Sequence, residues 1–455
     1  MILSIIIPTF NRKKLLEKTL MYICNQKNVN MHEVEIIVVD DGSNDNSDEV
    51  VNKYKAENAN IKYVYIPRQA AESNRSKVRN IGISQAVGKY ITFIDCGVVI
   101  PERFVENVLN IYDELKEAAA IFHYTLGVNV DVNSEEAKVI NELSTQNFSS
   151  IVKQLEKSYE WADTREELFD SVNGKLSRLP APWTLGWSLV ITVPKKYVDY
   201  INGFDESFVG WGSEDIDFCY RLYKKGVQFI SESTKKSIHI PHIISNSSGK
   251  EISNIKNREK LHKKFWNLET ELYVIYTGRY YNYVLAKLNN LIISNVIPRY
   301  ETSFLINLKD KYIKNNQKTL LIGNDRKYMP EILGVNNVFV HNKLTYDKFK
   351  KMYKSLEVNY ILGINTKYED NYFDVAVVTD FYRMFSEKVL SKFIKESKRI
   401  CKEVYLIYDA KFISPVKKFD NNRWLNINEI KEAVEKCGFK LIQKCYKDYF
   451  ILCIC

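Results

Sequence analysis

Three carboxylates, Glu214, Asp215 and Asp217, follow a Gly-Trp-Gly and open an apolar, aromatic run that predicts a buried helix. Glycines allow a sharp turn and a close approach of a ligand to the backbone, and Trp211 offers a flat apolar face on which a sugar ring can stack. Acidic side chains are favoured at a helix N-terminus, where they could simply form a capping box. Beside an aromatic platform, an ionised carboxylate can instead act as general base toward a hydroxyl, and the Gly-Trp-Gly favours that interpretation.

Strands alternate with helices along the first hundred residues. Apolar runs predict strands at 3–7, 34–39, 61–66 and 90–94, and helical spacing predicts helices at 12–23, 48–55 and 75–85. This alternation is typical of a parallel, doubly wound sheet covered on both faces. Ligands of such sheets bind beyond the carboxyl ends of the strands.

Polar and aromatic residues follow these strands at the points where each strand ends. A carboxylate after the second strand, Asp40 or Asp41, can accept a hydrogen bond from the uracil N3–H or from ribose hydroxyls. Thr9 and Phe10 would form a floor for the base, and Asp95 could hold the ribose or a divalent cation. One aspartate at a strand end is commonly just a turn former, but four such features in order favour a nucleotide-sugar site.

Five segments together resemble glycosyltransferase family 2, a group of inverting enzymes with the GT-A fold: SIIIPTFNR, IIVVDDGSNDNS, VRNIGI, YITFIDCG and GWGSEDIDFCYRL. The acidic segment is similar to that of the galactosyltransferase and chondroitin-polymerase type. The resemblance covers about residues 1 to 250 and implies a UDP-sugar donor.

The resemblance also implies roles for individual residues. Those expected at the donor nucleotide are Pro8, Thr9, Phe10, Asp41, Arg79 and Asp95. Trp211 and Trp187 would contact the acceptor or a sugar ring. Asp215 would be the catalytic base, with Glu214 beside it holding a sugar. An α-linked donor would then give a β-linked product in a single in-line displacement.

One departure concerns the metal. The family usually ends its fourth strand with Asp-x-Asp, whereas this chain has Asp95-Cys96-Gly97. Asp95 with His239 or His242 and diphosphate oxygens could still hold Mn²⁺ or Mg²⁺. Alternatively, Arg75, Lys77 and Arg79 would neutralise the leaving group without a metal, and the two histidines would be ordinary strand residues.

A second α/β unit is expected at residues 318–455, after a helical connector at 251–317. Its later half resembles class I S-adenosylmethionine-dependent methyltransferases, in FDVAVVTDFYRM, EVYLIYD and LNINEIKEAVEKCGFKLI. Its first loop is Gly323-Asn324-Asp325 in place of a glycine-rich loop, and its second strand ends in His341-Asn342 where an acid should hold the ribose. We therefore expect a degenerate domain that serves acceptor recognition or homodimerisation.

Composition sets the remaining limits. The 455 residues fit two or three domains, and 45% hydrophobic residues are ample for real cores. Lys and Arg exceed Asp and Glu by 65 to 56, a mild bias that suits an anionic ligand without requiring a nucleic acid. The eight cysteines form no CxxC pair and suggest reduced thiols. Without a signal peptide or membrane span, the sequence predicts a cytoplasmic protein, peripheral to the membrane at most.

Three function classes remain open from the sequence. The first is transfer of a hexose or N-acetylhexosamine from a UDP-sugar to a saccharide or glycoconjugate. The second is transfer to a peptide Ser, Thr or Cys, as in a bacteriocin-modifying enzyme, for which a separate domain could bind the peptide. The third is an inactive sugar-nucleotide binder, prompted by the altered Asp-x-Asp. The segment at 124–180 is expected to be an acceptor-side insertion, so donor sugar and acceptor identity depend on its conformation.

Overall fold

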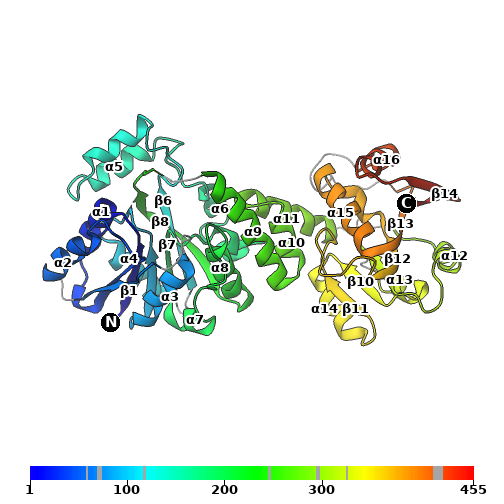
Figure 1. Ribbon diagram of the computed structural model, residues 1–455, viewed down its shortest axis with the longest axis horizontal. Coiled ribbons are helices and arrows are strands. Elements are labelled where there is room, and N and C mark those ends of the chain that lie inside the picture. Colours follow the sequence, from blue (N-terminus) through cyan, green and yellow to red (C-terminus); the bar gives the residue numbers. More distant parts are fainter. Residues whose placement is uncertain are drawn as a thin grey trace. The chain divides into compact units, whose positions relative to one another are not determined.

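The computed structural model describes residues 1–57, 60–68, 74–115, 119–243, 247–293, 298–323, 326–412 and 424–455. The chain divides into two compact units, Met1–Glu259 and Lys260–Cys455. Each unit has its own sheet flanked by helices (Figure 1), so the predicted α/β class with two sheet-containing units is confirmed. The division falls within helix α9 (Ser247–Phe265), whereas the sequence suggested an end near residue 250.

The first unit contains an eight-stranded sheet with the order β3-β2-β1-β4-β7-β6-β8-β5. Its strands are β1 (Leu3–Thr9), β2 (Val34–Asp40), β3 (Ile61–Tyr65), β4 (Tyr90–Ile94), β5 (Val98–Val99), β6 (Ala119–Leu126), β7 (Val190–Pro194) and β8 (Gln228–His239). Strands β1 to β4 pair in parallel, and β7 runs antiparallel to β4. All four predicted strands are present, and their carboxyl ends meet at one edge of the sheet.

Helices connect the parallel strands and cover the sheet. They are α1 (Lys13–Cys24), α2 (Ser47–Glu57), α3 (Arg75–Gln85) and α4 (Phe104–Glu114). Asn74 caps α3 by accepting a hydrogen bond from the Lys77 N–H at 2.9 Å. A Cβ atom built on Gly82 of α3 would collide with Ile6 of β1. The glycine therefore lets α3 approach the sheet closely and brings Arg79 to the strand ends.

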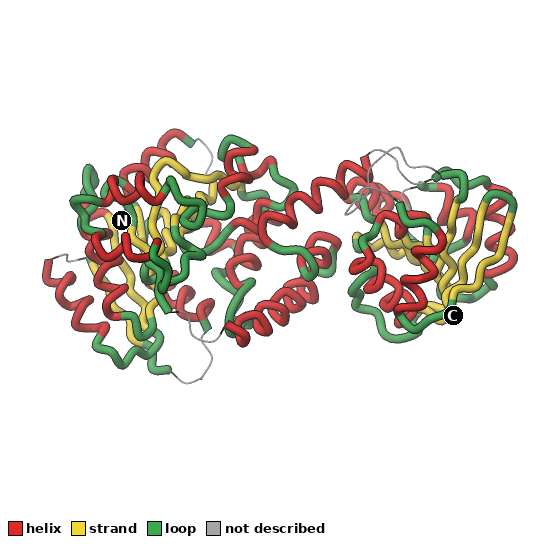
Figure 2. Tube along the Cα trace, turned by 90° about the horizontal axis from the view of Figure 1, so that it is seen from above, coloured by secondary structure: helices red, strands yellow, loops and turns green. Residues whose placement is uncertain are grey.

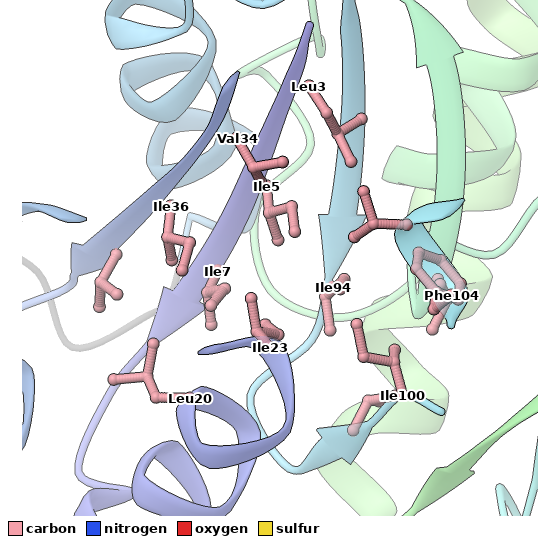
Figure 3. Packing of buried hydrophobic residues seen from close by; sticks show 14 of the residues in the cluster. Leu3, Ile5, Ile7, Leu20, Ile23, Val34, Ile36, Ile94, Ile100 and Phe104 are labelled. Atoms are coloured by element: carbon pink, nitrogen blue, oxygen red, sulfur yellow. The ribbon is translucent and has the colours of Figure 1, made fainter. Parts of the chain in front are cut away.

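The core of the first unit lies between β1, β2, β4 and the helices that cover them. Ile5 and Ile7 of β1 face Leu20 and Ile23 of α1, as Figure 3 shows, and all four side chains are fully buried. Burial of each such side chain stabilises the fold by about 1.5–3 kcal/mol. The strand ends that carry the candidate site therefore rest on a tightly packed support.

The expected insertion at 124–180 follows β6. It contains η2 (Glu136–Glu142), α5 (Phe148–Leu155), α6 (Glu166–Ser171) and η3 (Leu176–Arg178), and η4 (Pro182–Leu185) comes directly after it. Arg165 is buried, and its guanidinium donates hydrogen bonds to Asp163, to the Leu185 carbonyl and to the His123 carbonyl. This buried ion pair ties the insertion to β6 and to the segment that leads into β7.

The second unit contains a seven-stranded sheet with the order β11-β10-β9-β12-β13-β15-β14, and the tube view shows its strands side by side (Figure 2). The strands are β9 (Thr319–Ile322), β10 (Asn337–Val340), β11 (Glu357–Tyr360), β12 (Phe373–Val378), β13 (Cys401–Asp409), β14 (Leu441–Tyr446) and β15 (Tyr449–Ile454). Strands β9 to β13 pair with one another in parallel. Strand β15 lies between β13 and β14 and pairs antiparallel with both. The helices of the unit are α10 (Leu268–Tyr273), α11 (Gly278–Ile293), α12 (Thr302–Tyr312), α13 (Tyr328–Leu333), α14 (Lys343–Met352), α15 (Glu387–Ile400) and α16 (Ile427–Lys436).

Membrane spans and disulfides were the two further features considered from the sequence. No helix in the part of the chain that the structure describes is both long and apolar enough to cross a membrane. None of the eight cysteines, all of which lie in described segments, takes part in a disulfide.

Candidate active site

The Gly-Trp-Gly turn leads directly into helix α8 (Glu214–Lys224). Gly210, Gly212 and Ser213 have φ angles of +81°, +93° and +68°. A left-handed conformation at a non-glycine residue such as Ser213 costs roughly 1–3 kcal/mol and needs support from its surroundings. The turn leaves Trp211 39% exposed at the start of the helix that carries the acids.

Arg79 joins acids from two different elements. Its Nη2 atom lies 3.0 Å from Asp95 Oδ1, just after β4, and its Nη1 atom lies 3.4 Å from Glu214 Oε1, at the start of α8. The Arg79 side chain is only 2% exposed, whereas the Asp95 side chain is 38% exposed. Arg75 adds a weaker contact, with Nη1 3.8 Å from Glu214 Oε1. Arg79 thus lies between Asp95 and Glu214 and fixes their positions, and its expected place near the diphosphate stays a prediction.

Asp215 lies in an environment that raises its pKa. Burial and the charge of Glu214 raise the pKa of Asp215 to about 7, against the opposing charge of Arg79 and backbone hydrogen bonds from Ile216 and Ser188. The Ile216 N–H donates to Asp215 Oδ1 at 2.8 Å. A carboxylate with a pKa near the working pH accepts a proton efficiently while it is still largely ionised.

Asp217, the third acid of the motif, has a structural role. It is fully buried, and its Oδ2 atom lies 2.7 Å from Arg221 Nε one helical turn later. Arg221 also donates to the Ile201 carbonyl. The acidic motif therefore separates into a pair at the strand ends, Glu214 and Asp215, and a buried ion pair inside the unit.

The ends of β1 and β2 form the expected nucleotide edge. Asp40 is fully buried and accepts hydrogen bonds from the Ser43 N–H and the Tyr63 hydroxyl, both at 2.7 Å. Asp41 is half-buried, and burial raises its pKa against the nearby charge of Arg68. Of the two aspartates that the sequence left open, only Asp41 offers its carboxylate to this edge.

Phe10 and Arg68 form a second feature of the same edge. Phe10 is 37% exposed, and the Arg68 guanidinium carbon lies 3.9 Å from the centroid of its ring. Pro8 is half-buried beside it. The Thr9 side chain instead points inward and donates to Cys96 Sγ at 3.6 Å, so at this edge Thr9 contributes its backbone, whose carbonyl accepts from the Asp41 N–H. Sequence reasoning missed Arg68, whose only signal is a basic residue shortly after the third strand.

Gly97 explains the altered Asp-x-Asp. Its φ angle is +102°, its N–H donates to Thr19 Oγ1 at 2.9 Å, and its carbonyl accepts from the Ile240 N–H at 2.9 Å. A residue with a side chain would be strained in this conformation. The tight connection from β4 to β5 therefore accommodates a glycine where the family usually has a carboxylate.

His239 and His242 lie beside this connection. His239 ends β8, where it pairs with Val98, and its ring centroid lies 5.0 Å from that of His242. Burial lowers the pKa of His239 to about 4 and also lowers that of His242, against the nearby charge of Asp95. The His239 Nδ1 atom is buried and has no hydrogen-bond partner. The lowered pKa values favour the neutral form of both rings, which is the form that binds metals.

The donor set fits a metal only in part. The described residues contain no group of three or more His, Cys, Asp or Glu side chains arranged to hold a metal ion. An ion here would therefore take several of its ligands from the diphosphate and from water.

Trp187 packs against Arg165 of the insertion. It is half-buried, and the Arg165 guanidinium lies 4.5 Å from its ring. The neighbouring Ser188 contributes a backbone hydrogen bond to Asp215, and the Leu189 carbonyl accepts from the Asp95 N–H at 3.0 Å. Residues 187–189 therefore join Asp215 to the end of β4. Nothing in the sequence pointed to Arg165, which supports this segment from the insertion.

The corresponding edge of the second unit is filled by its own side chains. The His341 and Phe381 rings lie 3.6 Å apart, and a Cβ atom built on Gly323 would lie 2.5 Å from Thr379 Oγ1. Asn342 caps α14 by accepting from the Leu344 N–H. Asn324 and Asp325, the rest of the expected cofactor loop, lie outside the described residues.

Two buried acids of the second unit are also fully engaged. Glu271 of α10 accepts hydrogen bonds from four successive backbone N–H groups, at residues 362–365, over distances of 2.6–3.1 Å. Asp380 binds Arg383, the Tyr300 hydroxyl and the Asp409 N–H, and burial raises its pKa to about 6. The backbone N–H groups at residues 362–365 thus bind Glu271 in place of an external anion, and the carboxylate of Asp380 binds donors of its own unit.

The first unit matches the models of two protein families. Residues 4–163 match the model of glycosyl transferase family 2, and residues 171–243 match that of the N-terminal domain of galactosyltransferase. Validoxylamine A glucosyltransferase from Streptomyces hygroscopicus subsp. jinggangensis is 29% identical over 280 residues, 61% of this chain and 64% of that protein. Chondroitin synthase from Escherichia coli is 32% identical over 246 residues, 52% of this chain and 34% of that protein.

Each of these matches spans less than two thirds of the relative's length. Among solved structures, S. aureus TarS 1–349 in complex with UDP gives a TM-score of 0.41 at 17% identity, covering 68% of this chain and 80% of that one. Both family matches lie within residues 4–243 and include the strand ends and the acidic motif. The first unit is therefore similar to glycosyl transferase family 2 over residues 4–163 and to the N-terminal domain of galactosyltransferase over residues 171–243.

Proposed function

We propose that the chain is an inverting glycosyltransferase that moves a hexose or N-acetylhexosamine from a UDP-sugar to a saccharide or glycoconjugate. The observation that carries this proposal is the position of Glu214 and Asp215 at the start of α8, where Arg79 joins Glu214 to Asp95 at the end of β4. Asp215, whose pKa is raised to about 7, suits a base that works near neutral pH.

In the proposed reaction, Asp215 accepts the proton of an acceptor hydroxyl. The acceptor oxygen forms a bond to the anomeric carbon while the bond from that carbon to the UDP oxygen breaks, and UDP leaves with the electron pair. Attack from the face opposite UDP inverts the anomeric configuration. Phe10 and Asp41 would bind the uridine, with Arg68 beside them, and Trp211 and Trp187 would hold sugar rings.

The charge that develops on the diphosphate needs a counter-charge. Asp95 with either His239 or His242 would hold Mn²⁺ or Mg²⁺, with the diphosphate and water as further ligands, and the unpartnered Nδ1 of His239 supports this choice. Such an ion would offset the charge of the leaving UDP.

Basic side chains are the alternative source of counter-charge. Arg75 and Arg12 lie near enough to Lys250 for their charges, together with burial, to lower its pKa. Arg79 is already neutralised by two acids, and Lys77 lies near Asp41. Of the basic residues that the sequence offered, Arg75 is therefore the one best placed to stabilise the leaving group.

We further propose that the second unit is a degenerate methyltransferase-like domain that serves acceptor recognition or dimerisation. The order of the strands supports the resemblance. As in the class I methyltransferase fold, the last strand, β15, lies antiparallel between β13 and β14. The filled strand ends support the loss of cofactor binding.

A donor and acceptor screen tests the transferase. UDP-Glc, UDP-Gal, UDP-GlcNAc, UDP-GalNAc and a GDP-sugar control would be titrated into the full chain by calorimetry, with Mn²⁺ and with EDTA. Transfer would be followed as UDP release with validoxylamine A, chondroitin oligosaccharides or Ser, Thr and Cys peptides as acceptors. Binding of one UDP-sugar and a β-linked product from the α-linked donor would support the proposal. Absence of any UDP-sugar binding would overturn it, and loss of binding in EDTA would favour the metal over the basic residues.

A further inference from the structure

Helix α9 supports the Gly-Trp-Gly turn from a distant part of the sequence. Ser253, Asn254 and Asn257, all on the part of α9 that belongs to the first unit, contact residues 209–212. From its sequence this segment was expected to be a helical connector. Its side chains instead make the polar contacts that the turn itself lacks.

Asn257 makes the largest set of these contacts. Its side chain is 7% exposed, and Nδ2 lies 3.1 Å from the Val209 carbonyl, 3.3 Å from the Trp211 carbonyl and 2.9 Å from the Gly212 carbonyl. Because all three partners are acceptors, the amide must present its NH₂ group to the turn. The amide has two N–H groups for three carbonyls, so at least one hydrogen bond is shared, and one buried side chain thus bridges three residues of the turn.

Ser253 holds the turn from the same side. Its Oγ atom accepts a hydrogen bond from the Trp211 N–H at 2.9 Å. A Cβ atom built on Gly210 would collide with Ser253 Oγ, and one built on Gly212 would lie 2.6 Å from Asn254 Oδ1. The positive φ angles favour both glycines, and the absence of a side chain leaves room for Ser253 and Asn254 of α9.

We propose that Asn257 and Ser253 are positioning residues that fix the indole of Trp211 and the entry into α8 for binding of the acceptor sugar. The inference rests on the proposed function and deepens it, because it assigns the acceptor platform to a helix outside the motif. A turn with two glycines and a left-handed Ser213 samples many conformations when free. Cross-bonds to α9 select one of them in advance, which lowers the cost of binding a sugar ring.

The first test needs neither a donor nor an acceptor. The full chain would be labelled with 5-fluorotryptophan, and the ¹⁹F signal of Trp211 assigned with Trp211→Phe. In Asn257→Ala the Trp211 signal should shift or broaden, and in Asn257→Asp the change should be at least as large, because a carboxylate cannot donate to the three carbonyls. Lys256→Ala, an exposed neighbour on the same helix, is the matched control and should leave the signal unchanged.

The second test separates positioning from general damage to the fold. With the acceptor identified by the screen, Asn257→Ala and Ser253→Ala should raise the KM for the acceptor about tenfold and leave the dissociation constant of UDP within about twofold. An unchanged Trp211 signal in both Asn257 variants would overturn the inference. A loss of UDP affinity as large as the rise in the KM for the acceptor would also overturn it. If no transfer is found at all, the proposed function fails, but the ¹⁹F result still decides whether α9 positions Trp211.

Discussion

The two units present the same kind of sheet edge in opposite states. In the first unit, Asp41, Asp95 and Asp215 lie at the carboxyl ends of the strands or on the helix beside them, half-buried or partly exposed. In the second unit, Asp380 and Glu271 are buried and bound by the unit's own donors. The parallel sheet alone therefore does not make a ligand site. The difference lies in whether the charged groups keep unused hydrogen-bonding capacity.

Burial has different consequences for the acids of the two units. Asp215 has a raised pKa and only a few backbone donors, so it can take a proton from a substrate. Glu271 also has a raised pKa, caused by burial, yet four backbone N–H groups bind its carboxylate. A shifted pKa therefore indicates chemistry only where the group is also accessible.

The largest effect is expected from Asp215→Asn. Loss of the general base should lower kcat by about 10²- to 10⁴-fold, with UDP affinity unchanged, as measured by UDP release and calorimetry. Asp217→Asn, two residues away, is the matched variant: it should lower Tm by loosening the Arg221 pair while kcat stays near that of the wild type. Unchanged turnover of Asp215→Asn on an oxygen acceptor would remove Asp215 from the mechanism.

The pH dependence sharpens the same assignment. Asp215 must be deprotonated to accept a proton, and its pKa is raised to about 7. Below that pH, kcat/KM should therefore fall about tenfold per pH unit, and above it the rate should level off. A profile from pH 5.5 to 9 checks this, with UDP affinity measured at each pH. A rate that stays flat down to pH 5.5 would contradict the assignment.

A smaller effect is expected at the nucleotide edge. Asp41→Ala removes the accessible carboxylate after β2 and should weaken UDP binding about tenfold, the value of one hydrogen bond to a charged group. Asp48→Ala removes an exposed acid from α2 and should leave the affinity unchanged. Equal affinity in both variants would mean that the uridine lies elsewhere.

The smallest effect on the first unit is expected from a change in the second. Glu271→Ala leaves four backbone N–H groups, three of them buried, without an acceptor, which should destabilise the second unit by about 3 kcal/mol or more. Differential scanning calorimetry would detect this as a lower transition temperature, while UDP affinity should stay within about twofold. If UDP binding is lost while the transition is unchanged, the two edges do not act independently.

Much of the fold follows from periodic patterns. The alternation of apolar runs and helical spacing predicted all four parallel strands of the first unit, because burial on both faces leaves continuous apolar runs. The strand ends also pointed to Asp95 and to either Asp40 or Asp41, since a doubly wound sheet gathers its loops at one edge. The acidic motif predicted the position of Asp215 at the start of a helix.

Contacts between residues far apart in the sequence could not be predicted. Arg68, Arg165 and Asn257 contact the site from distant segments, and a polar residue in an ordinary loop or helix carries no signal of its eventual partner. The inward turn of Thr9 toward Cys96 is likewise a matter of packing that periodicity does not encode. Arg79 was recognised as important, but its burial beneath two acids depends on the close contact at Gly82.

One calorimetric experiment tests the central contrast most directly: UDP and S-adenosylmethionine titrated separately into the full chain. The partly open edge of the first unit predicts that UDP binds at a single site and that the heat is reduced in Asp41→Ala. The filled edge of the second unit predicts no heat for S-adenosylmethionine. Binding of S-adenosylmethionine without binding of UDP would contradict the account and would make the second unit the enzyme.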